Sequence, residues 1–175
     1  MSQYLVLTAM GADRTGSVSE LIKLASKYGC NIIDSRMAIF GAEFTLIMLL
    51  NGSAKSINQI ESKLPAVALS LELITMMKRT DNYKPRDLTH HYQVDYAGIG
   101  QPGVLKAMTA FFATRKIDIS SLKSEIDPKN NQMKASILIA LTDAISITAL
   151  EHDYFELCNL IDVQGCIKKV NSNLL

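Results

Sequence analysis

The chain has 175 residues, of which 48% are hydrophobic, and its 18 basic and 17 acidic residues leave a net charge of +1. Proteins that bind nucleic acid directly take much of their affinity from a basic excess or a basic stripe, and this sequence shows neither. Its apolar runs are strand-length and fall short of the roughly 20 residues of a membrane-spanning helix. The composition therefore favours a globular protein that binds neither nucleic acid nor a membrane.

Three cysteines and three histidines are scattered along the sequence without metal-binding spacing. An odd number of cysteines without a Cys-x-x-Cys motif argues against disulfides and structural zinc, and it is typical of a reducing compartment. The amino-terminal residues show no basic segment and no cleavage site of a signal peptide. We therefore expect a cytoplasmic protein that holds no metal ion and no other cofactor.

The first half of the chain alternates between strand-like and helix-like patterns. A glycine-bracketed loop, Met10–Val18, separates the first predicted strand from the first predicted helix. Glu43–Leu50 is apolar on both faces, which predicts a strand that is central or covered on both sides. Pro65 is expected to break or bend the second helix. The predicted elements are strands over 3–9, 31–40, 43–50 and 69–78, and helices over 16–28 and between Ser53 and Pro65.

The second half repeats this order. The predicted elements are strands over 90–97, 117–126, 132–141 and 165–170, and helices over 102–115 and 145–161. Each half is thus a βαββαβ unit, the ferredoxin-like arrangement of an antiparallel four-stranded sheet with two helices on one face. We predict an α+β protein with domains over 1–80 and 90–175 and a linker over 81–89. Because domains of about 80 residues are marginally stable alone, we expect the halves to share a core or an interface.

The glycines of the first loop, Gly11 and Gly16, recur in the second half as Gly98 and Gly103 with the same spacing. Glycine permits positive φ and close approach of another group. The first N–H groups of the following helix have no partner within the helix, so they attract a carboxylate or phosphate. Neither loop continues as a nucleotide-binding P-loop. The loops are therefore candidate carboxylate sites, unless the glycines serve backbone geometry alone.

Polar residues near these loops suit a zwitterionic ligand. Arg14 offers a guanidinium to a carboxylate, unless it forms a surface ion pair with Asp13 or another neighbour. Asn31 begins the second predicted strand and can both donate and accept hydrogen bonds. Asp118 occupies the matching place in the second half. Both residues are also typical of a turn that leads into a strand, so that alternative stays open.

The sequence shows no constellation of catalytic residues. The serines have no candidate base nearby in the sequence, and no pair of carboxylates flanks a loop. Cys30 lacks a cationic neighbour that would activate its thiol. An amino-acid enzyme and a DNA-binding repressor remain the rival functions, and both are disfavoured. We predict a regulatory protein rather than an enzyme, with no catalytic residues.

A βαββαβ unit with a glycine-bracketed Asp-Arg-x-Gly loop after its first strand resembles the ACT domain, a family of small regulatory modules that often bind amino acids. Both halves of the chain share this resemblance. The chain also resembles the tandem ACT-domain repressors of bacteria. The stretches that carry the likeness lie at 4–16, 29–36, 43–50 and 77–80.

The resemblance implies a ligand between the first loop of one unit and the start of the second strand of a neighbour. By position, those residues are Gly11, Asp13, Arg14, Gly16 and Asn31 in the first unit, and Gly98, Gln101, Gly103 and Asp118 in the second. The second unit departs from the pattern, because Gly100 and Gln101 replace Asp13 and Arg14. We therefore expect ligand binding at the first loop, and weaker binding or none at the second.

The resemblance further implies a repressor of the glycine cleavage operon that has no DNA-binding domain of its own. Such a protein would contact a LysR-type transcriptional activator, and glycine would relieve the repression. We also expect a homo-oligomer. The alternative is an ACT-type regulatory subunit, or the remnant of an amino-acid enzyme, that controls another amino-acid pathway.

Overall fold

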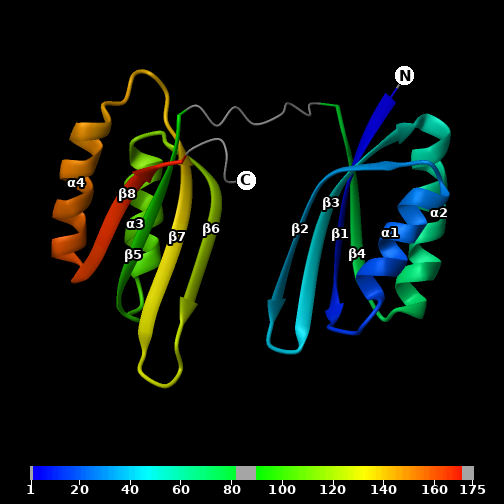
Figure 1. The fold of residues 1–175 in the computed structure, drawn as a ribbon, viewed down its shortest axis with the longest axis horizontal. Coiled ribbons are helices and arrows are strands. Elements are labelled where there is room, and N and C mark those ends of the chain that lie inside the picture. Colours follow the sequence, from blue (N-terminus) through cyan, green and yellow to red (C-terminus); the bar gives the residue numbers. More distant parts are fainter. Residues whose placement is uncertain (1, 82–89, 171–175) are drawn as a thin grey trace. The chain divides into compact units, whose positions relative to one another are not determined.

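The computed structural model describes residues 2–81 and 90–170. The chain divides into two compact units, Met1–Pro85 and Arg86–Leu175. Each unit has two helices on one face of a four-stranded antiparallel sheet (Figure 1). The predicted α+β fold is therefore confirmed. Apart from Asp81, the linker predicted over 81–89 lies outside the described residues.

The first unit has the strand order β2-β3-β1-β4, so β1 and β3 are central. Ser53 caps the second helix, and its side-chain oxygen accepts a hydrogen bond from the Ser56 N–H at 3.1 Å. The elements are β1 (Ser2–Ala12), α1 (Ser17–Lys27), β2 (Asn31–Phe40), β3 (Glu43–Ser53), α2 (Ala54–Ser70) and β4 (Ile74–Thr80).

The second unit repeats the topology with the order β6-β7-β5-β8. Ser146 caps its second helix in the same way as Ser53. No helix within 2–81 and 90–170 is long and apolar enough to cross a membrane. The elements are β5 (His91–Ile99), α3 (Val104–Thr114), β6 (Asp118–Ile126), β7 (Gln132–Ala140), α4 (Ile147–Leu160) and β8 (Val163–Lys169).

Two predicted boundaries are wrong. The first strand continues to Ala12 rather than ending near residue 9, because Gly11 stays in the ladder opposite Phe44. Pro65 lies inside α2, which runs on to Ser70 instead of giving way to a strand. Leu64 and Ala68 are buried on either side of the proline, and their packing keeps the last turn helical.

Each unit buries its own core between the sheet and the helices. In the first unit Leu5, Leu7, Met48 and Leu50 from the central strands are almost fully buried. Alternate residues of these strands lie on the opposite face of the sheet, away from the helices. β3 is central in the sheet, as predicted, and it is covered on one face only, because Ile47 on the opposite face is 47% exposed.

The two units differ on this open face of the sheet. In the first unit it presents large apolar side chains, and Met10, Ile47, Ile74 and Met76 are each between 47% and 70% exposed. In the second unit the face is polar. The register places Asp95, Ala97, Lys134, Ser136, Gln164 and Cys166 there. The duplicated fold thus carries two chemically different surfaces.

Candidate functional site

The first candidate loop lies at the end of β1, beside the turn between α2 and β4. Gly11 does not have positive φ, contrary to the prediction for a turn residue. Its role is close approach, because a Cβ at this position would lie 2.8 Å from Leu73 Cδ2 and 2.9 Å from the Glu72 carbonyl oxygen. Because Gly11 has no side chain, the loop can lie directly against Glu72.

Gly16 is the N-cap residue of α1 and has φ of 97°, which confirms the predicted positive φ. The Ser17 N–H donates to the Arg14 carbonyl oxygen at 3.2 Å, and the Glu20 N–H donates to the Gly16 carbonyl oxygen at 3.0 Å. The N–H groups of Val18 and Ser19 have no acceptor among the described residues. Two donors at the positive end of α1 are thus available to a carboxylate.

Close approach of another group does not explain the glycine at position 16. A Cβ at Gly16 would have no heavy atom within 4 Å. The constraint at this position is therefore the positive φ, not the space around it. The same is true of Gly103, which has φ of 99° and an equally open Cβ position.

Arg14 forms an ion pair with Glu72, whose side chain lies 2.6 Å from the guanidinium. The alternative of a surface ion pair is thus realised, though with Glu72 rather than with Asp13. Both side chains are at least half exposed. The hydrogen bond from Arg14, and secondarily its positive charge, hold the pKa of the Glu72 carboxyl below its usual value. The pair therefore holds a carboxylate in place beside the loop.

Removing the guanidinium should raise the pKa of Glu72. In Arg14→Ala we expect the Glu72 carboxyl to titrate near its ordinary value, measured by NMR titration of the full chain. Because Arg14 lowers the folded-state pKa, its stabilising effect is present above the unfolded pKa of about 4.3 and is lost as pH falls through the folded pKa. The effect on stability should be small, since both groups are exposed. An unchanged Glu72 titration would mean that the pair does not persist in solution.

The second candidate loop has glycines at the same positions as the first, but different hydrogen bonds hold it in place. Gly98 lies in β5 against Val163, as Gly11 lies against Leu73. The Gly100 N–H donates to the Asn131 carbonyl oxygen at 2.7 Å, and the Asn131 amide donates back to the Gly100 carbonyl oxygen at 3.0 Å. Gln101 stands in place of Arg14 and forms no ion pair. The second loop is thus fastened to the hairpin between β6 and β7.

Asn31 and Asp118 do not join these loops within their own units. Asn31 begins β2 opposite Asn51, which in turn pairs with Tyr4 on β1. Gly11 lies seven residues further along β1, so about 23 Å separates the two ends of the sheet. Asp118 likewise begins β6 opposite Ala140, which pairs with His91 on β5, seven residues before Gly98. The first unit by itself therefore does not bring its loop and Asn31 into one site.

Comparisons with known proteins identify the family. A family model described as the ACT domain matches residues 3–78. The glycine cleavage system transcriptional repressor of Escherichia coli (strain K12) is 39% identical over 174 residues, which cover 96% of this chain and 90% of the repressor. The chain belongs to the family of this ACT-domain repressor. The repressor of the same name from Shigella flexneri matches with the same identity and coverage.

Solved structures agree with membership of this repressor family. A crystal structure described as a glycine cleavage system transcriptional repressor shares 36% identity with a TM-score of 0.81, and the match covers 98% of this chain and 99% of that chain. A protein from Galdieria sulphuraria shares the fold with a TM-score of 0.80 at 22% identity, over 98% of this chain and all of that chain. Both solved structures therefore share the fold over nearly the whole of their chains.

The structure adds Glu72 to the residues of the first candidate site. Arg14 and Glu72 are 58 residues apart in the sequence. No motif connects them, since Glu72 lies in the short turn after α2 and was expected to be part of a strand. The turn gives Glu72 a positive φ of 56°, which is uncommon for this residue type. Only the fold brings its carboxylate to the loop.

Proposed function

We propose that the protein is a repressor of the glycine cleavage system that responds to a small amino acid and acts without catalysis. The observation that carries this proposal is the 39% identity to the Escherichia coli repressor over 96% of the chain. The duplicated ACT fold supports it, because two linked binding units can couple occupancy of a ligand site to affinity for a partner.

The proposed partner is a LysR-type activator protein rather than DNA. The net charge of +1 supports this, because direct DNA binding depends on neutralising several phosphates. The open apolar face of the first sheet, with Met10, Ile47 and Met76, supports a protein contact of this unit. Glycine would release the activator by binding more tightly to the form of the repressor that does not contact the activator.

The test of this function uses cells that lack the gene and carry a reporter fused to the glycine cleavage promoter. We expect raised expression without the gene, repression when the full chain is restored, and relief by glycine. In vitro, the purified chain should bind the immobilised activator and should not shift promoter DNA at physiological salt. A sequence-specific shift by the pure chain, with a steep salt dependence, would overturn the proposed mode of action.

We propose that glycine binds at the first loop, with its carboxylate on the N–H groups of Val18 and Ser19 and on Arg14. The open donors and the nearby guanidinium support this placement. The position of Asn31 at the far end of the sheet supports a site completed by a second copy of the chain, and hence a homo-oligomer. Light scattering on the purified chain tests the oligomeric state.

The two loops should respond differently to matched substitutions. Arg14→Ala should weaken glycine binding by roughly ten- to a hundredfold, because a charge-assisted hydrogen bond contributes about 1.5–3 kcal/mol. Asn31→Ala should weaken binding similarly if its amide contacts the ligand in a neighbouring unit. Gln101→Ala is the matched control in the second loop and should leave the affinity unchanged. Calorimetric titration of glycine and serine measures all three.

Melting curves of the same variants serve as the control for folding. Equal losses in Arg14→Ala and Gln101→Ala would contradict the asymmetry between the loops. Wild-type affinity in both Arg14→Ala and Asn31→Ala would place the ligand elsewhere on the protein.

A further inference from the structure

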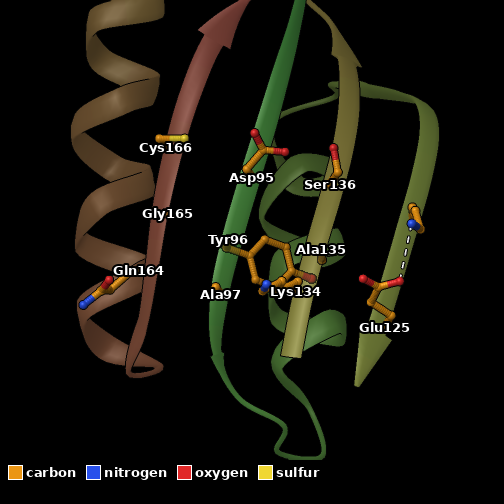
Figure 2. A pocket seen from close by; sticks show the side chains of 11 residues that line it. Asp95, Tyr96, Ala97, Glu125, Lys134, Ala135, Ser136, Gln164, Gly165 and Cys166 are labelled. Atoms are coloured by element: carbon orange, nitrogen blue, oxygen red, sulfur yellow. Dashed lines mark ion pairs between the residues drawn. The ribbon is translucent and has the colours of Figure 1, made fainter. Parts of the chain in front are cut away.

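The open face of the second sheet contains a hollow of about 490 Å³. It crosses all four strands of the unit, and it is lined by three consecutive residues of each of β5, β7 and β8 and by two residues of β6 (Figure 2). A volume of this size is within the range of small-molecule sites in proteins. The residues that line its open side are Asp95, Ala97, Lys123, Glu125, Lys134, Ser136, Gln164 and Cys166.

Comparison with the first unit explains why a hollow exists here. In the first sheet Ile47 lies opposite Thr8, and in the second sheet Ser136 lies opposite the matching Asp95. Met10 and Met76 of the first sheet are likewise replaced by Ala97 and Cys166, as the strand pairings show. Small residues thus stand at the centre of the second face where the first face has large ones. The exchange removes the side chains that would otherwise fill the space.

Among the described residues, neither Asp95 nor Lys134 at the centre of the hollow forms an ion pair. The Asp95 carboxylate accepts hydrogen bonds from the Gln93 amide at 2.9 and 3.0 Å, which orient it without neutralising it. Lys134 has no ion pair among the described residues. Glu125 lies opposite Lys134 in the ladder, yet its carboxylate pairs with Lys123 at 3.4 Å.

The register places these two free charges side by side. Asp95 pairs with Ser136 and Ala97 pairs with Lys134, so Asp95 and Lys134 are diagonal neighbours on adjacent strands. The backbone positions of such a pair are about 7–8 Å apart, so both side chains can reach one small ligand. The strand alternation puts both side chains on the open face of the sheet. Figure 2 shows Gln164 and Cys166 on β8 at one side of them and Glu125 on β6 at the other.

We propose that this hollow binds a small zwitterion, with the ligand's ammonium on Asp95 and its carboxylate on Lys134. The charges are complementary to a molecule that carries both groups, and the volume suits one larger than glycine. Two sources share this chemistry: a free amino acid with a long side chain, and a dipeptide. The site is separate from the first loop and does not depend on the glycine site proposed above.

The test follows the backbone amide signals of the isotope-labelled full chain by NMR. The probes are L-methionine and glycyl-L-methionine, each compared with a form that lacks one charge, N-acetyl-L-methionine and L-methionine methyl ester. We expect saturable shifts in β5 and β7 with at least one zwitterion, and at least about tenfold weaker binding of both single-charge forms. Binding of methionine identifies a free amino acid as the source, and binding of the dipeptide alone identifies a short peptide.

Three variants probe the site itself. Asp95→Asn and Lys134→Gln should each weaken binding at least about tenfold. Ser136→Ile introduces the residue that the first unit has at the matching position, so it should block the hollow without changing a charge. Lys129→Gln removes a lysine in the hairpin turn and serves as the matched control. Arg14→Ala should leave this binding unchanged, which separates the result from that of the glycine site.

Three outcomes would overturn the proposal. One is the absence of shifts in β5 and β7 with either zwitterion. Another is binding that survives both Asp95→Asn and Ser136→Ile in variants that melt like the wild type. The third is loss of binding to the activator protein in Ser136→Ile while neither zwitterion binds, since this face would then be a protein-docking surface.

Discussion

Gly165→Ala is expected to lower the free energy of unfolding of the second unit by roughly 2–4 kcal/mol. A Cβ at this position would overlap the Tyr154 hydroxyl and would lie 2.7 Å from Tyr154 Cζ. Tyr154 is fully buried, and its hydroxyl donates to the Asp95 carbonyl oxygen at 3.0 Å. The ring therefore has no room to retreat without losing that hydrogen bond.

The first unit provides the control for this prediction. At the matching positions it has Thr75 in place of Gly165 and Leu64 in place of Tyr154. The double variant Tyr154→Leu with Gly165→Ala should therefore lose less stability than the sum of the two single changes. Thr75→Ala should have little effect. Urea denaturation, with the amide signals of each unit followed by NMR, measures these differences. A Gly165→Ala protein within about 0.5 kcal/mol of the wild type would show that Tyr154 repacks freely.

The order of elements was predictable because it depends on local patterns. Alternating apolar residues and two glycine-bracketed loops specify βαββαβ twice, and the structure has that order. The boundaries were less predictable where packing overrides local preference. Gly11 stays in a ladder despite its low strand propensity, and Pro65 stays in a helix because Leu64 and Ala68 on either side of it are buried.

The chemistry of the sites depended on contacts that the sequence does not display. Arg14 was recognised from its motif, whereas Glu72 reaches it only through the turn after α2. Asp95 and Lys134 are 39 residues apart in the sequence, and only the register of β5 and β7 makes them neighbours. Asn31 was expected to approach the loop of a neighbouring unit, and the topology places it at the end of the sheet away from the loop of its own unit. Long-range pairing is the common cause of these differences.

Gly16→Val is expected to destabilise the first unit by roughly 1–3 kcal/mol and to abolish glycine binding. The φ of 97° at Gly16 is strongly disfavoured for a β-branched residue. Relief of this strain would rotate the peptide that precedes α1, and the N–H groups of Val18 and Ser19 would then point away from the ligand. Stability and affinity should thus fall together, and both are measured on the same protein by urea denaturation and calorimetry.

A series of substitutions separates backbone strain from crowding at Gly16. Because a Cβ there meets no heavy atom within 4 Å, crowding predicts no effect from alanine, whereas strain predicts a graded loss. Asparagine tolerates positive φ better than alanine, and alanine tolerates it better than valine, so the loss should increase in the order Asn, Ala, Val. Gly103→Val is the matched control. It has the same strain, with φ of 99°, so it should cost the second unit similar stability while leaving glycine affinity intact. Loss of glycine binding in Gly103→Val alone would assign the site to the second loop instead.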